Sequence, residues 1–160
     1  MLKERVITAI VLIAVLMGVL FYCPPLYFSL LCLFAFAVGA WEWGNLSGLS
    51  GIKRIVGSGV LIGAMAATGY AVSWSGELNQ NVIEKILLVA GSWWAIAFLW
   101  IRSFPASAVL WQKSIVRYCL GFVVLIPPLI AIAWMREQNS GIAYLLFALA
   151  LVSAADIGAY

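Results

Sequence analysis

Asp156 is the residue of this sequence best suited to chemistry, because it is the one carboxylate set far inside an apolar stretch. An Asp near the centre of a bilayer costs about 2.5 to 3.5 kcal/mol to insert, so something should compensate it. On a helix, Ser153 lies three residues before Asp156 and Tyr160 four residues after it, so the three side chains form one polar stripe. Such a stripe could line an aqueous pocket. Alternatively, the apolar span ends near residue 153 and Asp156 is an ordinary acid at the membrane surface.

The other candidate groups offer little chemistry. The sequence has no histidine, which removes an imidazole base and a histidine metal ligand from its first 160 residues. Glu42, between two tryptophans, is expected to be an acid at the membrane interface. The net charge of +3 is small and scattered, so no nucleic-acid partner is expected. The three cysteines lie in or beside apolar runs without a ligand pattern and are expected to be buried hydrophobes: Cys23, Cys32 and Cys119.

The elements that hold these residues are predicted from composition. Apolar residues make up 66% of the chain and charged residues 9%, too few polar side chains to cover a protein in water. The apolar runs are continuous and close to the roughly 20 residues that cross a bilayer as a helix, which excludes an alternating β-barrel pattern. The sequence therefore predicts an all-α, polytopic transmembrane helix bundle with about six spans, over residues 6–22, 26–41, 55–74, 86–101, 118–135 and 142–158.

Basic residues predict the orientation of the bundle. Seven of the nine lie before the first span, after the second and after the fourth, whereas only Lys85 and Arg136 lie in the intervening connections. The positive-inside rule then places the N-terminus in the cytoplasm. The apolar run after the first charges lacks a cleavage site and is expected to remain as a signal anchor.

Three further patterns concern packing. Small residues recur every four positions, which favours close contact between spans and could also join copies of the chain. Pro127 and Pro128 should break or kink the fifth span, either absorbed by packing or forming a cavity wall. The segment 102–117 is expected to be an interfacial helix or a plain linker. The small-residue seams are Gly59, Gly63 and Ala67 on the third span and Ala150, Ala154 and Gly158 on the sixth.

Four strings together point to a family. They are Met1-Leu2-Lys3-x-Arg5 at the start, Pro24-Pro25 after the first span, Ala40-Trp41-Glu42-Trp43-Gly44-x-Leu46-Ser47-Gly48, and Ala155-Asp156-x-Gly158-Ala159-Tyr160. In this order and spacing, across nearly the whole chain, they resemble the N-terminal half of bacterial phosphatidate cytidylyltransferases, also called CDP-diacylglycerol synthases.

The resemblance implies an enzyme of phospholipid biosynthesis in the cell inner membrane. It would transfer a cytidylyl group from CTP to phosphatidate and release diphosphate, with Mg²⁺ as cofactor, because the metal neutralises phosphate oxygens and aligns the reactants. On this basis Asp156 is the expected catalytic and metal-binding residue, and Ser153 and Tyr160 are expected to bind substrate at a cavity.

The sequence departs from the family where its diagnostic C-terminal signature should stand. That signature contains Lys-Asp, then His-Gly-Gly, then Asp-Arg-x-Asp, and none of it occurs in these 160 residues. The expectation is therefore a truncated family member, spanning 1–160 as the N-terminal portion, that is inactive by itself.

Two other readings of the sequence stay open. The chain could be a non-catalytic membrane subunit or small carrier in which Asp156 is an intramembrane ion site. It could also be a structural anchor whose small-residue seams serve oligomerisation. Replacing Asp156 separates the three, because an enzyme would lose turnover, a carrier would lose coupling and an anchor would be indifferent.

Overall fold

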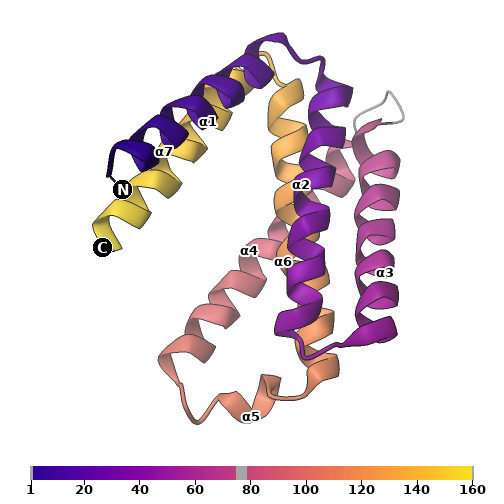
Figure 1. The fold of residues 1–160 in the computed structure, drawn as a ribbon. Coiled ribbons are helices and arrows are strands. Elements are labelled where there is room, and N and C mark those ends of the chain that lie inside the picture. The colour runs from indigo at the N-terminus through magenta and orange to yellow at the C-terminus, as the bar shows by residue number, and fades with distance from the viewer. Residues whose placement is uncertain (1, 75–78, 160) are drawn as a thin grey trace.

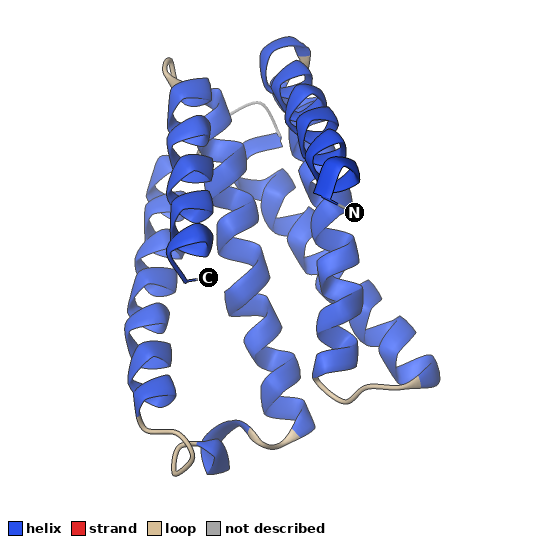
Figure 2. Ribbon diagram, turned by 60° about the vertical axis from the view of Figure 1, so that its left-hand side comes forward, coloured by secondary structure: helices blue, strands red, loops and turns tan. Residues whose placement is uncertain are grey.

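The computed structural model describes residues 2–74 and 79–159, and nearly all of them are helical (Figure 1). The long helices are α1 (Leu2–Tyr22), α2 (Pro25–Leu46), α3 (Gly51–Gly69), α4 (Gln80–Arg102), α6 (Ser114–Glu137) and α7 (Gly141–Ala159), with a π-helical turn η1 (Tyr70–Trp74) and a short α5 (Ala108–Trp111) between them. The described residues contain no strand, so the predicted all-α class is confirmed (Figure 2).

Each predicted span lies within one of these long helices, except that the third continues from α3 into η1. Five helical stretches of the described chain are long and apolar enough to cross a membrane: Pro25–Leu46, Gly51–Val72, Gln80–Arg102, Ser114–Glu137 and Gly141–Ala159. In α1 a shorter apolar stretch, Ile13–Tyr22, stands out. The prediction that the N-terminus is cytoplasmic is not tested by the fold.

Prolines and glycines set the turns between neighbouring helices. Pro24 is the N-cap of α2 and Pro25 its first residue, a position where the missing backbone N–H costs nothing. Between α2 and α3, Gly48 and Gly51 have φ values of +80° and +53°, a backbone region that glycine enters without steric cost. Both turns are therefore tight enough to return the chain directly across the bundle.

Helix α6 is the centre of the bundle. It packs against α2, α3, α4 and α7, and α2 also packs along α3 (Figure 1). The buried cluster formed by Ala40, Leu61, Met65 and Leu129 joins α2, α3 and α6. At the far end of α6, a second cluster of Leu20, Phe28 and Leu145 joins α1, α2 and α7.

The outer faces of the helices are strongly apolar. Ile52, Leu88 and Ile157 are 77%, 72% and 78% exposed, respectively. Such surface would be costly in water, whereas in a bilayer it contacts lipid tails. The exposed side chains thus agree with a membrane location for the bundle.

The small-residue seams do not pack as predicted. An added Cβ at Gly59, Gly63 or Gly158 would meet no other atom within 4 Å, and Ala150 and Ala154 are exposed. The helices instead meet through larger side chains, because α3 turns Leu61 and Met65 toward α2 and α6. The prediction that these seams hold the bundle together is wrong for this chain, and their use between copies stays a prediction.

The two predicted irregular segments also differ in detail. Helix α6 runs through Pro127 and Pro128 without a break, and Pro127 is buried, as expected where packing absorbs the proline. In the segment 102–117, Arg102 ends α4 and residues 114–117 already form the first turn of α6, and between them lies the four-residue α5. Residues 103–113 therefore form a linker with one short helix across the end of the bundle.

Gly121 of α6 lies so close to α2 and α3 that there is no room for a side chain at this position. A Cβ there would lie 2.6 Å from Cδ1 and Nε1 of Trp43 and 3.0 Å from Cδ1 of Leu61. We expect Gly121→Ala to lower the free energy of unfolding by about 1 to 3 kcal/mol, because the indole ring cannot move aside without repacking α2. Thermal unfolding of the purified protein in detergent would measure the loss. Gly59→Ala, whose Cβ meets nothing, is the matched control, and an equal loss in both variants would contradict this account.

Candidate functional site

Asp156 and Ser153 lie in the second half of α7, where both are exposed. Tyr160, the third member of the predicted stripe, lies outside the described residues. Within the part of the chain that the structure describes, no side chain pairs with Asp156, and no three His, Cys, Asp or Glu side chains come together to hold a metal ion. The catalytic, metal-binding and substrate-binding roles assigned to these residues therefore stay predictions.

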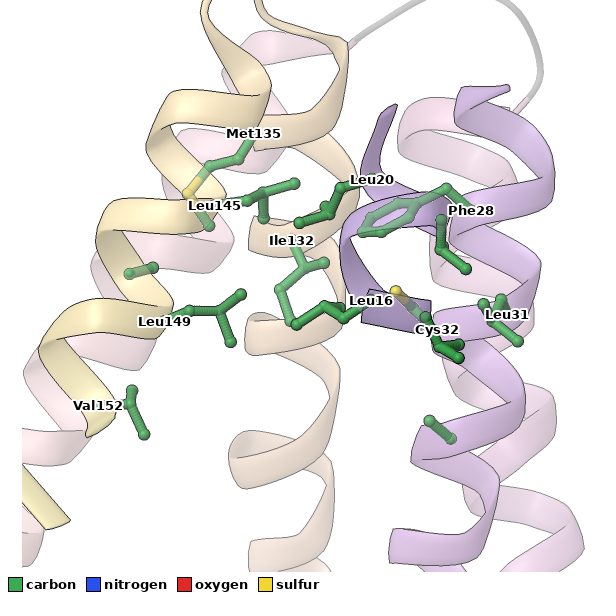
Figure 3. A pocket seen from close by; sticks show the side chains of 14 residues that line it. Leu16, Leu20, Phe28, Leu31, Cys32, Ile132, Met135, Leu145, Leu149 and Val152 are labelled. Atoms are coloured by element: carbon green, nitrogen blue, oxygen red, sulfur yellow. The ribbon is translucent and has the colours of Figure 1, made fainter. Parts of the chain in front are cut away.

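Next to this stripe the structure contains an apolar cleft that sequence reasoning missed. It has a volume of about 490 Å³ and is bounded by α1, α2, α6 and α7 (Figure 3). The lining side chains carry no oxygen or nitrogen, and they are Val15, Leu16, Val19, Leu20, Phe28, Leu31, Cys32, Ala35, Ile132, Met135, Leu145, Ala148, Leu149 and Val152. Figure 2 shows α1 and α7 standing apart, as the two walls of such a cleft must.

Helical spacing places Asp156 on the face of α7 that lines this cleft, one turn beyond its last lining residue. The α7 residues that line it include Leu145, Leu149 and Val152, which follow one face of the helix. Asp156 comes seven residues after Leu149 and four after Val152, so it continues the same face one turn further along. Ser153 lies at the edge of that face. The described cleft is apolar rather than aqueous, and the carboxylate stands at its end.

A cleft of this kind suits hydrocarbon. Ligand pockets commonly have volumes of about 300 to 1,000 Å³, and this one lacks polar groups that could orient a water-soluble molecule. Polar molecules entering it would lose their hydrogen bonds to water without replacement. The cleft can therefore accept acyl chains but not a nucleotide, which would have to stay at its polar end.

A second group of functional interest lies where α2 meets α3. Arg54 Nε donates a hydrogen bond to the carbonyl oxygen of Trp41 at 3.1 Å, and its guanidinium carbon lies 4.1 Å from the centroid of the Trp41 ring. Arg54 Nη2 also lies 3.5 Å from Glu42 Oε1. Glu42 is thus the partner of a basic residue on the next helix. The expectation of an acid at the end of a span flanked by aromatic rings describes its position but not this pairing.

Polar contacts tie the first turns of α6 to this same end of the bundle. Ser114 Oγ donates to the carbonyl oxygen of Ser47 at 2.5 Å, and Trp43 Nε1 donates to the carbonyl oxygen of Arg117 at 3.0 Å. Tyr118 Oη donates to the carbonyl oxygen of Gly57 at 2.9 Å. The bonded residues are separated by between 61 and 74 positions in the sequence, so no sequence pattern predicts these bonds.

Basic side chains gather at this end, which holds the α2–α3 turn, the end of α4, α5 and the start of α6 (Figure 1). We call it the basic end, and its charged residues are Lys53, Arg54, Arg102, Lys113 and Arg117, with Glu42 as the one acid among them. Helix α7 starts at the opposite end and runs back toward the level of the basic end. Over the 15 residues from Gly141 to Asp156 it rises about 22 Å. Helix α7 ends about midway along the bundle (Figure 1), so the carboxylate near its end lies between the two ends of the bundle and short of the basic end.

The Ser114 contact can be tested by stability. Ser114→Ala removes the bond from α6 to the α2–α3 turn, and we expect a loss of about 1 kcal/mol in the free energy of unfolding. Ser92→Ala is the control, because Ser92 Oγ bonds only to the carbonyl oxygen of Leu88 within its own exposed helix. Thermal or denaturant unfolding in detergent would compare them. If both variants lose the same stability, the contact between α6 and the turn contributes nothing particular.

Comparison with known proteins identifies a matching family and two relatives. Residues 3–160 match the model of the cytidylyltransferase family. A phosphatidate cytidylyltransferase from Haemophilus influenzae is 34% identical over 171 residues, covering 100% of this chain and 59% of the relative. Another from Pseudomonas aeruginosa is 28% identical over 160 residues, covering 100% of this chain and 56% of the relative. The chain thus spans little more than half the length of these curated relatives, and no solved structure matches it.

Proposed function

The chain belongs to the cytidylyltransferase family, and from that membership we propose that it works in the transfer of a cytidylyl group from CTP to phosphatidate. The relatives named phosphatidate cytidylyltransferase align with all of it, which is the observation that carries the proposal. In this reaction a phosphate oxygen of phosphatidate attacks the α-phosphorus of CTP. The bond from that phosphorus to the oxygen bridging the α- and β-phosphates breaks, diphosphate leaves, and CDP-diacylglycerol forms.

The apolar cleft supports a lipid substrate. Its walls run from the Leu20, Phe28 and Leu145 cluster to Val152, and Asp156 follows one turn beyond. A phosphatidate with its acyl chains in the cleft would carry its phosphate at the Asp156 end. That end of the cleft points toward the basic end, because α7 runs in that direction (Figure 1). If the basic end faces the cytoplasm, as the positive-inside rule predicts, the lipid would come from the cytoplasmic leaflet of the inner membrane, on the side where CTP is dissolved.

Asp156 could supply one of the oxygen ligands of a Mg²⁺ ion. Its carboxylate is the hard oxygen donor that Mg²⁺ prefers, and Mg²⁺ is commonly held by one or two carboxylates together with substrate phosphates and water. The described residues contain no group of three or more His, Cys, Asp or Glu side chains that could hold a metal ion by itself. When bound, the metal would neutralise phosphate charge during the transfer. Asp156 would hold the polar substrate groups at the mouth of the cleft, while the apolar walls keep the acyl chains out of water.

Replacing Asp156 tests the proposal. In the full-length gene product, purified and supplied with CTP, phosphatidate and Mg²⁺, we expect Asp156→Asn to reduce formation of CDP-diacylglycerol roughly a hundredfold, the scale of losing one electrostatic partner of a transition state. Glu84→Gln, an exposed acid near the start of α4, is the control and should retain activity. Full activity in the Asp156 variant would remove this residue from the mechanism. No product from the unaltered protein would refute the proposed reaction itself.

The cleft is tested separately with a bulky side chain. Ala148 lines the cleft, whereas Ala150 is exposed and does not line it. We expect Ala148→Phe to raise the KM for phosphatidate about tenfold while leaving the KM for CTP unchanged, because the added ring occupies space needed by an acyl chain. Ala150→Phe adds the same ring to the other face of α7 and should change neither constant. Equal effects of both variants, or a changed KM for CTP alone, would contradict lipid binding in the cleft.

A further inference from the structure

We propose that a groove between α3 and α6 at the basic end binds an anionic phospholipid, with the headgroup at Lys53, Ser114 and Arg117 and one acyl chain along the groove. This site is separate from the cleft beside Asp156. The cleft uses the last turns of α6, whereas the groove uses its first turns, and Ser114 and Ile132 are about 27 Å apart along the helix axis. The inference applies to any anionic phospholipid and does not require the proposed reaction.

The groove itself has the shape and composition of a site for hydrocarbon. It encloses about 630 Å³, and its lining is mostly aliphatic: Leu49, Ile52, Lys53, Val56, Gly57, Val60, Ser114, Ile115 and Tyr118. The α3 residues in this set repeat at intervals of three and four, so they form one face of the helix. From Ile52 to Val60 that face extends about 12 Å, long enough for a substantial part of an acyl chain.

Two residues in contact keep the groove open. Tyr118 Oη donates to the carbonyl oxygen of Gly57, which fixes the phenol ring across the two helices. A Cβ on Gly57 would lie 2.9 Å from Leu49 Cδ1 and 3.2 Å from Tyr118 Cε2, so a larger residue there would displace the groove walls. The floor of the groove is thus held by a specific bond rather than by loosely packed side chains.

Unneutralised positive charge stands at one end of the groove. Lys53 is exposed and lines it directly. Arg117 follows Ser114 by three residues on α6, and the position of a Cβ on Gly48 would lie 3.4 Å from Arg117 Nη2 and 3.7 Å from Ser114 Oγ. The guanidinium therefore lies at the α2–α3 turn beside a residue of the groove.

Arg117 lacks a partner of its own. Its Nε is buried, and no group of the described chain accepts a hydrogen bond from it. The one acid of the basic end, Glu42, lies 3.5 Å from Arg54 instead. A partly buried cation without a counterion is unfavourable, and an anion that supplies oxygen acceptors would relieve this cost.

The combination of an apolar groove with cations at one end identifies the occupant as a lipid. A free phosphate would use the cations and leave the apolar groove empty, whereas an uncharged lipid would use the groove and leave the cations unpaired. A phospholipid with net negative charge satisfies both at once, and basic side chains near a membrane surface attract such lipids with about 1 kcal/mol each. The amphipathic layout, charge at one end and aliphatic side chains along the rest, matches one leaflet of a bilayer.

The experiment measures lipid binding to the purified protein by native mass spectrometry. Phosphatidylglycerol and phosphatidylcholine with identical acyl chains are supplied in equal amounts to the protein in detergent. The variants are Lys53→Gln and Arg117→Gln for the charges, with Lys85→Gln at the opposite end as control. Val60→Phe fills the groove, and Val89→Phe is its control, because Val60 and Val89 are similarly exposed, at 53% and 60%, but Val89 is on α4. Thermal unfolding verifies that each variant is folded, and if Arg117→Gln is not, Lys53→Gln and Val60→Phe decide alone.

We expect the unaltered protein to retain phosphatidylglycerol over phosphatidylcholine. Each charge variant should weaken that binding about fivefold, and Val60→Phe should weaken it as well, while both controls bind as the unaltered protein does. Equal loss in Lys85→Gln would mean that only total charge matters and would overturn the site. So would unchanged binding in Val60→Phe, equal retention of the two lipids, or displacement of the lipid by soluble glycerol phosphate at the same concentration. None of these results depends on whether CDP-diacylglycerol is formed, so the two proposals fail independently.

Discussion

The close approach of Trp43 to Gly121 is the contact on which the arrangement of the bundle depends. The indole ring lies where any side chain at position 121 would stand, and its Nε1 donates to the carbonyl oxygen of Arg117 one turn earlier on α6. This places α2 directly against the central helix. Helix α3 can then cover both, through Leu61 and Met65, and the remaining helices are added around the pair. In a membrane, association gains little from the hydrophobic effect, so such close packing and the polar bonds beside it must supply the specificity.

The number and extent of the helices could be predicted because the bilayer imposes them. Without water, each backbone N–H and C=O must be paired within the chain, so a continuous apolar run becomes a helix. The faces on which the helices meet could not be predicted in the same way. Gly59 and Gly63 look like an interface because their spacing permits close approach, but they face outward. Both lipid tails and neighbouring helices present apolar surface to a span, so hydropathy does not distinguish a packed face from an exposed one.

In the candidate site too, the charged residue could be predicted from the sequence, whereas the apolar surfaces beside it could not. Asp156 stands out in the sequence because a carboxylate inside an apolar run is costly. The cleft beside it does not, because Leu149 and Val152 have the same residue types whether they line a cavity or face the bilayer. The bond from Ser114 to the carbonyl oxygen of Ser47 joins positions 67 residues apart, and only the folded chain brings them together. The sequence therefore predicts the residue that carries charge but not the surfaces that position its ligands.

Charge and hydrocarbon are kept apart in this molecule, and that separation limits where the proposed reaction can occur. A triphosphate cannot enter the cleft, because its lining has no polar group to replace water around the phosphate oxygens. Acyl chains, conversely, gain nothing from leaving it. The two substrates can meet only at the boundary, one turn beyond Val152, where Asp156 follows on α7. A single negative group is a poor site for two anionic substrates, since it repels both unless cations are added. That positive charge could come from a metal ion or from basic side chains, including any in the rest of the relatives' length that this chain does not cover.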